Sequence, residues 1–247
     1  MFDTSMLVVT GLAFLLAGFV KGVIGMGLPT VAVAVLTLTM PPALAAALYV
    51  LPAVATNVWQ SVAGPSLIRL LRRLGTMFAG VILGIWFGAG MLTADTNGHA
   101  AVALGVALAA YATFGLLSPG LSVPREWEGW LSPLVGLCTG LITGATGIFI
   151  IPAVPYVQAL QMEREELIQA LGLSFLVATA TLAVVLTRAG ILGAEVAAIS
   201  LVAIVPAAIG MYLGQIFRTR ASPEMFRRCF FLGMLALGLN LASRAFR

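Results

Sequence analysis

The absence of charged residues over long stretches constrains the fold of this chain more than any other feature. Residues 22–68, 74–94 and 129–162 contain no Asp, Glu, Lys or Arg. A helix needs about 20 apolar residues to cross a hydrocarbon core about 30 Å thick, and each stretch is long enough for at least one such helix. The stretches therefore predict helices that span a membrane.

The composition supports the same class. Of the 247 residues, 61% are hydrophobic and only 9% are charged, whereas soluble domains carry about 25% charged residues. The formal charge of +4 comes from arginine clusters near the predicted span ends, which favours contact with lipid headgroups and not with nucleic acid. Cys138 and Cys229 both lie in apolar runs, so we expect structural cysteines without a disulfide or a metal site.

Apolar runs between charges, turns and prolines predict helices, because lipid offers no partner for the open edge of a sheet. The predicted ranges are 6–20, 28–39, 43–64, 74–92, 99–117, 131–143, 149–160, 166–187, 195–217 and 226–243. Four of them, 6–20, 28–39, 131–143 and 149–160, are too short to span comfortably. They form two adjacent pairs, and a cluster of glycines divides each pair.

The glycine spacing repeats along the chain. Gly18, Gly22 and Gly25 recur 122 residues later as Gly140, Gly144 and Gly147, and Gly84 and Gly88 recur 126 residues later as Gly210 and Gly214. The matches follow one order of elements: a broken pair, a long helix, a polar or Arg-bearing loop, and two long helices. We therefore expect two homologous halves in one membrane domain, a first repeat at 1–120 and a second at 130–247, joined by a linker at 121–129.

The positive loops predict how these halves are oriented. Such loops should lie on the cytoplasmic side. The two most positive segments are 69–73 and 218–228, so an even number of crossings must separate them. This holds if each broken pair is a re-entrant or short helical hairpin, which leaves three full spans in each half. The sequence thus predicts an all-α, polytopic transmembrane bundle of two inverted repeats, each beginning with a broken hairpin, an architecture typical of transporters.

The glycine clusters also predict where a solute binds. Glycines at the density of residues 18–27 weaken a helix, and Pro29 suits the first turn of a new one, so we expect the helix to stop and restart here. The N-terminus of a helix presents unpaired N–H groups and the positive end of a dipole, which favour an anion. The matching break at 143–152 would supply a second N-terminus, and two such ends near the midplane would bind an oxyanion.

Polar residues near these breaks are the candidates for substrate binding. Lys21 is the sole basic residue among the first 68; it either extends to the membrane interface or provides the counter-charge for a substrate. Asn57 and Gln60 share a helix face, where they either bind substrate or hold helices together. Hydroxyls such as that of Thr179, which matches Asn57, usually bond their own backbone. The candidate residues are Lys21, Gly22, Gly25, Gly27, Asn57, Gln60, Thr143, Gly144, Thr146, Gly147 and Thr179.

An enzyme is the least favoured class. The chain has one histidine and nine acidic residues, and none of the carboxylates lies deep in a predicted span. No phosphate-binding loop, metal-ligand pattern or Ser/His/Asp set stands out. We therefore expect no catalytic residues, no metal and no cofactor.

Four stretches of the chain form a characteristic set: Gly18–Pro29, the Pro41-Pro42-Ala43 start and the Asn57–Gln60 end of the next segment, and Gly140–Gly147 in the second half. In these stretches the chain resembles the TauE/SafE family of sulfite exporters. The likeness extends over nearly the whole chain in length and plan. It implies a polytopic permease that exports sulfite or organosulfonates, with other sulfur anions as substrates in some members.

The residues and the resemblance together predict a multi-pass permease in the cell inner (plasma) membrane. It would export a small sulfur-containing oxyanion, such as sulfite or an organosulfonate, by alternating access. Its partners would be this anion and membrane lipid, with a homodimer as an option. Three alternatives stay open: an anion channel, an uptake carrier for another small anion, and a non-transporting membrane assembly subunit.

Overall fold

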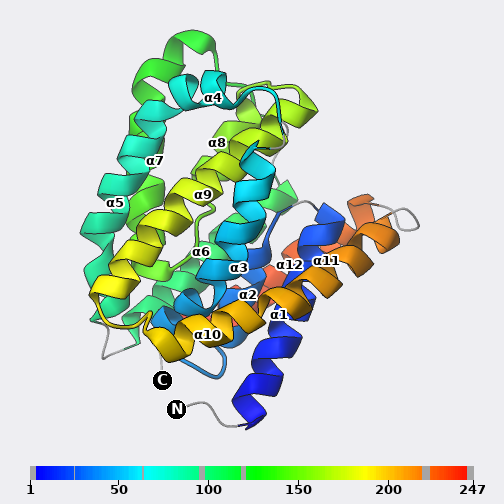
Figure 1. Ribbon diagram of the computed structural model, residues 1–247. Coiled ribbons are helices and arrows are strands. Elements are labelled where there is room, and N and C mark those ends of the chain that lie inside the picture. Colours follow the sequence, from blue (N-terminus) through cyan, green and yellow to red (C-terminus); the bar gives the residue numbers. More distant parts are fainter. Residues whose placement is uncertain are drawn as a thin grey trace.

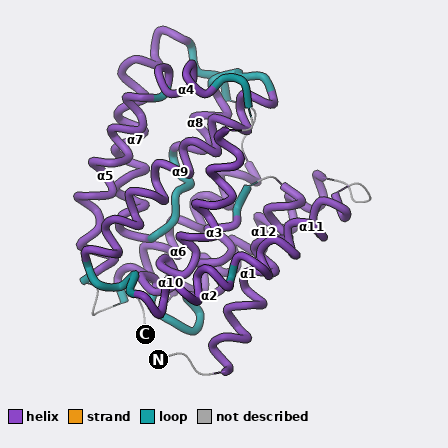
Figure 2. The backbone as a smooth tube through the Cα atoms, viewed as in Figure 1, coloured by secondary structure: helices purple, strands orange, loops and turns teal. Residues whose placement is uncertain are grey.

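The computed structural model describes residues 4–24, 26–62, 64–94, 98–117, 121–218 and 223–243. Within these ranges the chain forms helices joined by loops and contains no strand, as Figure 2 shows. The prediction of an all-α protein is therefore confirmed for the described residues.

Twelve helices lie in this part of the chain. Those of the first half are α1 (Thr4–Ile24), α2 (Leu28–Leu36), α3 (Pro42–Val62), α4 (Leu67–Arg73), α5 (Gly75–Thr93) and α6 (His99–Leu117). Those of the second half are α7 (Arg125–Thr146), α8 (Ala153–Ala159), α9 (Arg164–Arg188), α10 (Ala194–Val202), α11 (Ile204–Arg218) and α12 (Pro223–Ala242). Among the described residues, six helical stretches are long and apolar enough to cross a membrane: α1, α3, α5, α6, α9 and the combined α10 and α11. This is the helix content of a multi-pass membrane protein.

The first helix of each broken pair is longer than the sequence predicts. α1 continues past Lys21 to Ile24, and α7 extends on both sides of the predicted range 131–143 to reach 22 residues. The prediction that the first of these helices is too short to span was wrong, since α1 is long and apolar enough to cross a membrane. α7 is longer than predicted but is not among the six stretches that meet this description. Most glycines of the two helices lie against the backbone of a neighbouring helix: Gly18, Gly22, Gly136, Gly140 and Gly144. This close packing offsets the low helix propensity of glycine.

The chain does break after both helices, as predicted. α2 begins at Leu28 with Pro29 in its first turn, and Gly27 before it has a φ of 100°. Gly147 follows α7 with a φ of 79°, and residues 148–152 are not helical. Glycine adopts a positive φ at little cost. These two glycines therefore set the direction in which the chain leaves and enters the broken helices.

Two other boundaries differ from the predicted ones. The segment around Arg69 forms the short helix α4, because its leucines recur at helical spacing and Leu70 is fully buried. The predicted helix 195–217 divides at Ala203 into α10 and α11. Pro206 explains this division, since proline has no N–H for the carbonyl of Val202 and fits the first turn of a new helix.

Helices of the first half pack mainly against helices of the second half. The most extensive contacts join α5 to α7, α1 to α11, α6 to α12 and α3 to α9, and the pairing of α5 with α7 and the crossing of α1 and α11 are visible in Figure 1. Glycines bring the backbones together: a Cβ on Gly84 would meet the carbonyl of Leu137, and one on Gly18 would meet the carbonyl of Ala207. Membrane helices commonly associate through such small residues.

A proline lies in the middle of α3. Pro52 cannot donate to the carbonyl of Leu48, and Ser200 of α10 donates its hydroxyl to that carbonyl instead, at 2.7 Å. Both Leu48 and Ser200 are fully buried. An unpaired backbone group costs several kcal/mol in a lipid environment, so this contact allows the proline in the helix that carries the site described next.

Candidate functional site

Lys21 is a buried cation at the end of α1. The residue is 9% exposed, and its Nζ donates to Thr56 Oγ1 at 2.8 Å and to Asn57 Oδ1 at 3.2 Å, both on α3. No carboxylate of the described residues forms an ion pair with it. Among the described residues, only neutral oxygens therefore bind this ammonium, and no negative group balances its charge. This position rules out extension of Lys21 to an exposed interface.

Asn57, the neighbour of Lys21, is buried and has N–H groups without a hydrogen-bond partner. It is 2% exposed, and its Nδ2 has no hydrogen-bond partner. The ammonium of Lys21 can donate hydrogen bonds but cannot accept one. Asn57 must therefore turn its side-chain oxygen toward Lys21 and its N–H groups away. A buried donor without a partner is costly. The pair thus combines an uncompensated positive charge with an enclosed amide N–H group that has no hydrogen-bond acceptor.

Thr56 orients this pair. Its Oγ1 donates to the carbonyl of Pro52 at 2.9 Å, with Ala53 as an alternative acceptor at 3.2 Å. Because its single proton is used in this way, its oxygen is free to accept from Lys21. The sequence reasoning missed Thr56, although its position beside Asn57 was a usable signal.

Lys21 lies in a cleft of about 870 Å³. The ends of α1 and α3, the beginning of α9 and the middle of α11 form its walls; the polar or small side chains among them are Lys21, Gly22, Thr56, Gln60, Gly64, Gln169 and Gln215. Trp59 also lines it, and Glu165 contributes the one carboxylate among its lining residues. Glu165 is exposed, in the first turn of α9. The predicted residues Lys21, Gly22 and Gln60 thus line one cleft. Asn57 does not line it, but is buried beside it as a hydrogen-bond partner of Lys21.

Gln60 and Gln169 hold two walls of this cleft in contact. Gln60 donates to the carbonyl of Ile168 on α9 at 2.9 Å. Gln169 is 1% exposed, donates to the carbonyls of Ser61 and Gly64 at 2.7 and 2.8 Å, and accepts from the backbone N–H of Ser66 at 2.9 Å. Gln60 therefore links α3 to α9 and also lines the cleft. Gln169 was not predicted, although it is a rare amide in an apolar helix.

The glycines predicted to bind substrate have different surroundings. A Cβ on Gly22 would meet the carbonyl of Met211, and one on Gly144 would meet the carbonyl of Ile85. Both therefore serve helix packing. Gly27 and Gly147 have positive φ values and permit the breaks. Gly25 lies outside the described residues.

The predicted residues of the second half do not line the cleft of Lys21. Thr143 and Thr146 donate their hydroxyls to carbonyls of their own helix, at 2.7 and 2.6 Å, and Thr179 is buried within α9. The second break lies against another part of α3, where the hydroxyl of Tyr49 donates to the carbonyl of Gly147 at 2.7 Å. Tyr49 and Asn57 are separated by eight residues, or about 12 Å along a helix.

A second cleft, of about 970 Å³, lies at the opposite end of the molecule. It is lined by residues around the loop from α2 to α3 and the loop from α9 to α10. The two clefts share no lining residue. Along α3, residues Ala45 to Val50 lie between the residues that line the two clefts, and each is at most 1% exposed. The buried middle of α3 therefore separates the two clefts.

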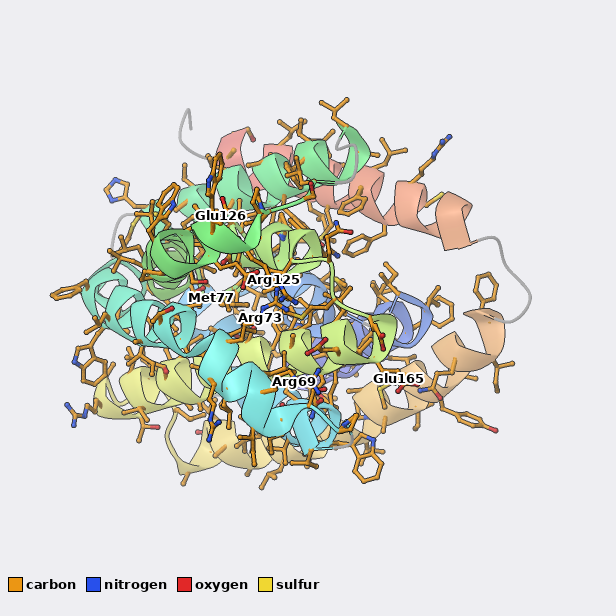
Figure 3. All side chains as sticks on the ribbon, turned by 90° about the horizontal axis from the view of Figure 1, so that it is seen from above. Arg69, Arg73, Met77, Arg125, Glu126 and Glu165 are labelled. Atoms are coloured by element: carbon orange, nitrogen blue, oxygen red, sulfur yellow. The ribbon has the colours of Figure 1, made fainter. Side chains whose placement is uncertain are left out.

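Charged residues gather at the end of the bundle where α4 lies, which we call the α4 end. The view from above in Figure 3 shows Arg69, Arg73 and Arg125 over the middle of the bundle. Arg73 forms two hydrogen bonds with Glu128 of α7, at 2.7 and 2.8 Å, and these raise the pKa of Arg73. The pair between Arg69 and Glu166 is longer, at 3.6 Å, and more exposed. The first pair is therefore the stronger link.

Comparison with known proteins agrees with this arrangement. The profile of the family described as "Sulfite exporter TauE/SafE" matches residues 10–241. Comparison with curated proteins and with solved structures gave no match. The match covers nearly the whole chain, including both breaks and every helix that forms the cleft. The chain therefore belongs to the TauE/SafE sulfite exporter family of membrane transporters.

Proposed function

We propose that this protein exports a small sulfur-containing oxyanion, such as sulfite or an organosulfonate, and that Lys21 and Asn57 bind it. One observation carries the proposal: Lys21 is a buried cation without a carboxylate partner, beside a buried amide with unused N–H groups. Such a site is incomplete without a negatively charged acceptor.

The number of donors fits an oxyanion. An ammonium has three N–H groups, and two of those of Lys21 are used on Thr56 and Asn57. One N–H of Lys21 and two of Asn57 remain. A sulfite or sulfonate group presents three oxygens on one sulfur, so these donors could each find an acceptor. The amide of Gln60 and the hydroxyl of Thr56 lie in the same cleft.

The two separate clefts support a carrier over a channel. A channel requires a continuous polar path, whereas here the buried middle of α3 lies between the clefts. The contact of Tyr49 with Gly147 joins α3 to the second break on the far side of this barrier. We propose alternating access, in which the barrier moves from one side of the anion to the other.

The pairing of helices supports two inverted repeats. At the predicted offset of 122 residues α1 corresponds to α7, and at an offset of 126 α5 corresponds to α11. The two close pairs α1 with α11 and α5 with α7 are then equivalent contacts, each made through matching glycines. α3 leads toward the α4 end, whereas α9 leads away from it (Figure 1). We propose that the halves are related by this inversion.

The positive residues support an orientation in which the cleft of Lys21 opens to the cytoplasm. Arg69, Arg72 and Arg73 lie at the α4 end, and positive loops favour the cytoplasmic side. The cleft of Lys21 is formed by the ends of α1 and α3 and the beginning of α9, near the α4 end. In this orientation the cleft would take up its anion from the cytoplasm, which is consistent with the export that we propose.

Flux through proteoliposomes tests the proposal. Wild type should release sulfite or methanesulfonate from loaded vesicles with saturable kinetics. Lys21→Gln should lower kcat/KM about tenfold to 100-fold, because hydrogen bonds to charged groups contribute about 1.5–3 kcal/mol, and Lys21→Arg should lose less. Arg72→Gln is the matched control, since Arg72 is an exposed cation that lines neither cleft. Equal flux in Lys21→Gln and wild type would remove Lys21 from the site.

A further inference from the structure

The distribution of charge in the helices bears on what drives transport. The sequence has nine acidic residues. Seven of them lie in or directly before the first turn of α7, α9, α10 or α12, and the other two, Asp3 and Asp95, lie outside the described residues. Lys21 contacts α3 at Asn57, five residues or about 8 Å before that helix ends. The cleft thus holds its cation deeper than any carboxylate that lines it.

The buried part of the empty cleft, at Lys21, therefore carries one positive charge, while Glu165 lies exposed at the mouth. Thr56 and Asn57 bind the ammonium through neutral oxygens and leave that charge uncompensated. A singly charged anion would make the loaded site neutral. A site with a carboxylate partner for Lys21 would behave in the opposite way, being neutral when empty and negative when loaded.

We infer that export is electrogenic and is driven by the membrane potential through Lys21, without a co-transported cation. This inference rests on the proposed function. The neutral, loaded site would turn outward and release the anion. The empty site, with its positive charge, would then be drawn back toward the negative interior. Each cycle moves one negative charge out, so a potential of 100 mV would support roughly a 50-fold concentration ratio.

Coupling to protons would require a titratable group at the cleft, and two of its lining residues, Lys21 and Glu165, are titratable. Glu165 is the one acidic residue that lines it, and it is exposed at its mouth. His99 begins α6 and lines neither cleft. Glu165 is therefore the residue whose removal tests coupling, and Glu165→Gln should leave the dependence on potential unchanged.

The experiment uses purified wild type in proteoliposomes with methanesulfonate as the probe, because this anion keeps one charge over the pH range of the assay. Valinomycin and a potassium gradient set the potential. At 100 mV, negative inside, the steady-state ratio of outside to inside concentration should reach roughly 50-fold, and a pH gradient alone should leave it at one. This ratio does not depend on the orientation of the protein in the vesicle.

Exchange measurements isolate the charge on the site. With methanesulfonate on both sides, only loaded sites cross, so the exchange rate should not change with potential, while net efflux should accelerate. An exchange rate that follows the potential would overturn the inference, because the loaded site would then be charged. A ratio that follows only the pH gradient, or one that loses its dependence on potential in Glu165→Gln, would overturn it too. Absence of any flux in wild type would instead count against the proposed function.

Discussion

At Asn57, replacing the amide nitrogen by an oxygen would add a negative charge to the site. Asn57→Asp would place a carboxylate beside the ammonium of Lys21, which lies 3.2 Å from Asn57 Oδ1. We expect anion flux to fall at least about tenfold, since the new ion pair would occupy the cation. The fold should persist, because the carboxylate would form a direct ion pair where the amide now has an unsatisfied N–H group. Flux and thermal unfolding measured on the same preparation check both parts; full flux in Asn57→Asp would contradict the account.

Ser200 is the residue that the account assigns to stability alone. Ser200→Ala would leave the carbonyl of Leu48 unpaired opposite Pro52, at a cost of about 1–3 kcal/mol. Ser243→Ala is the control, since its hydroxyl donates to the carbonyl of Asn240 in an exposed hydrogen bond at the C-terminal end of α12. Thermal unfolding in detergent should show a lower midpoint for Ser200→Ala and little change for Ser243→Ala. Equal midpoints would show that the carbonyl of Leu48 finds another hydrogen-bond donor when the Ser200 hydroxyl is removed.

Some residues of the site can be predicted from sequence and others cannot. Lys21 and Asn57 stand out because a charge or an amide is rare in an apolar helix. Thr56 and Ser200 do not, because hydroxyls are common in membrane helices and usually bond their own backbone. Their roles depend on which residue of another helix faces them. The contact of Tyr49 in α3 with Gly147 at the second break could not be predicted for the same reason.

At the scale of helices, glycines on one helix can have opposite roles. In α5, a Cβ on Gly84 would meet the backbone of α7 at Leu137, whereas one on Gly90 would meet nothing within 4 Å. We expect Gly84→Ala to cost about 1–3 kcal/mol or more through overpacking. Gly90→Ala should be neutral or add up to about 1 kcal/mol through helix propensity. Thermal unfolding of both variants checks this; equal destabilisation would contradict the packing described here.

The positions of the breaks could be predicted, and the lengths of the helices before them could not. Pro29 and the dense glycines correctly indicate that a helix restarts after Gly27. The same glycines suggest that α1 and α7 end early, because glycine weakens an isolated helix. In the folded chain, Gly18 and Gly140 face the backbones of α11 and α5. The tertiary contact overrides the local propensity, and only the structure reveals it.

At the scale of the whole molecule, the halves are not independent bodies. Each long helix pair joins the first half to the second, so movement between the clefts must shift one set of pairs against another. The pairs α1 with α11 and α5 with α7 are held by glycine contacts, and we expect each to move as a unit. The interleaving of the halves could not be predicted from sequence, because spacing identifies repeats without showing which helices they contact.

Equilibrium binding tests the central claim, that Lys21 completes an anion site in the cleft, most directly. Trp59 lines the same cleft, so its fluorescence should report an anion near Lys21. Titration of the purified protein with sulfite should give a saturable fluorescence change in wild type and none in Trp59→Phe, which assigns the signal to that side chain. The account predicts that Lys21→Gln abolishes the change or weakens the apparent affinity about tenfold or more. Saturable binding of undiminished affinity in Lys21→Gln would contradict it.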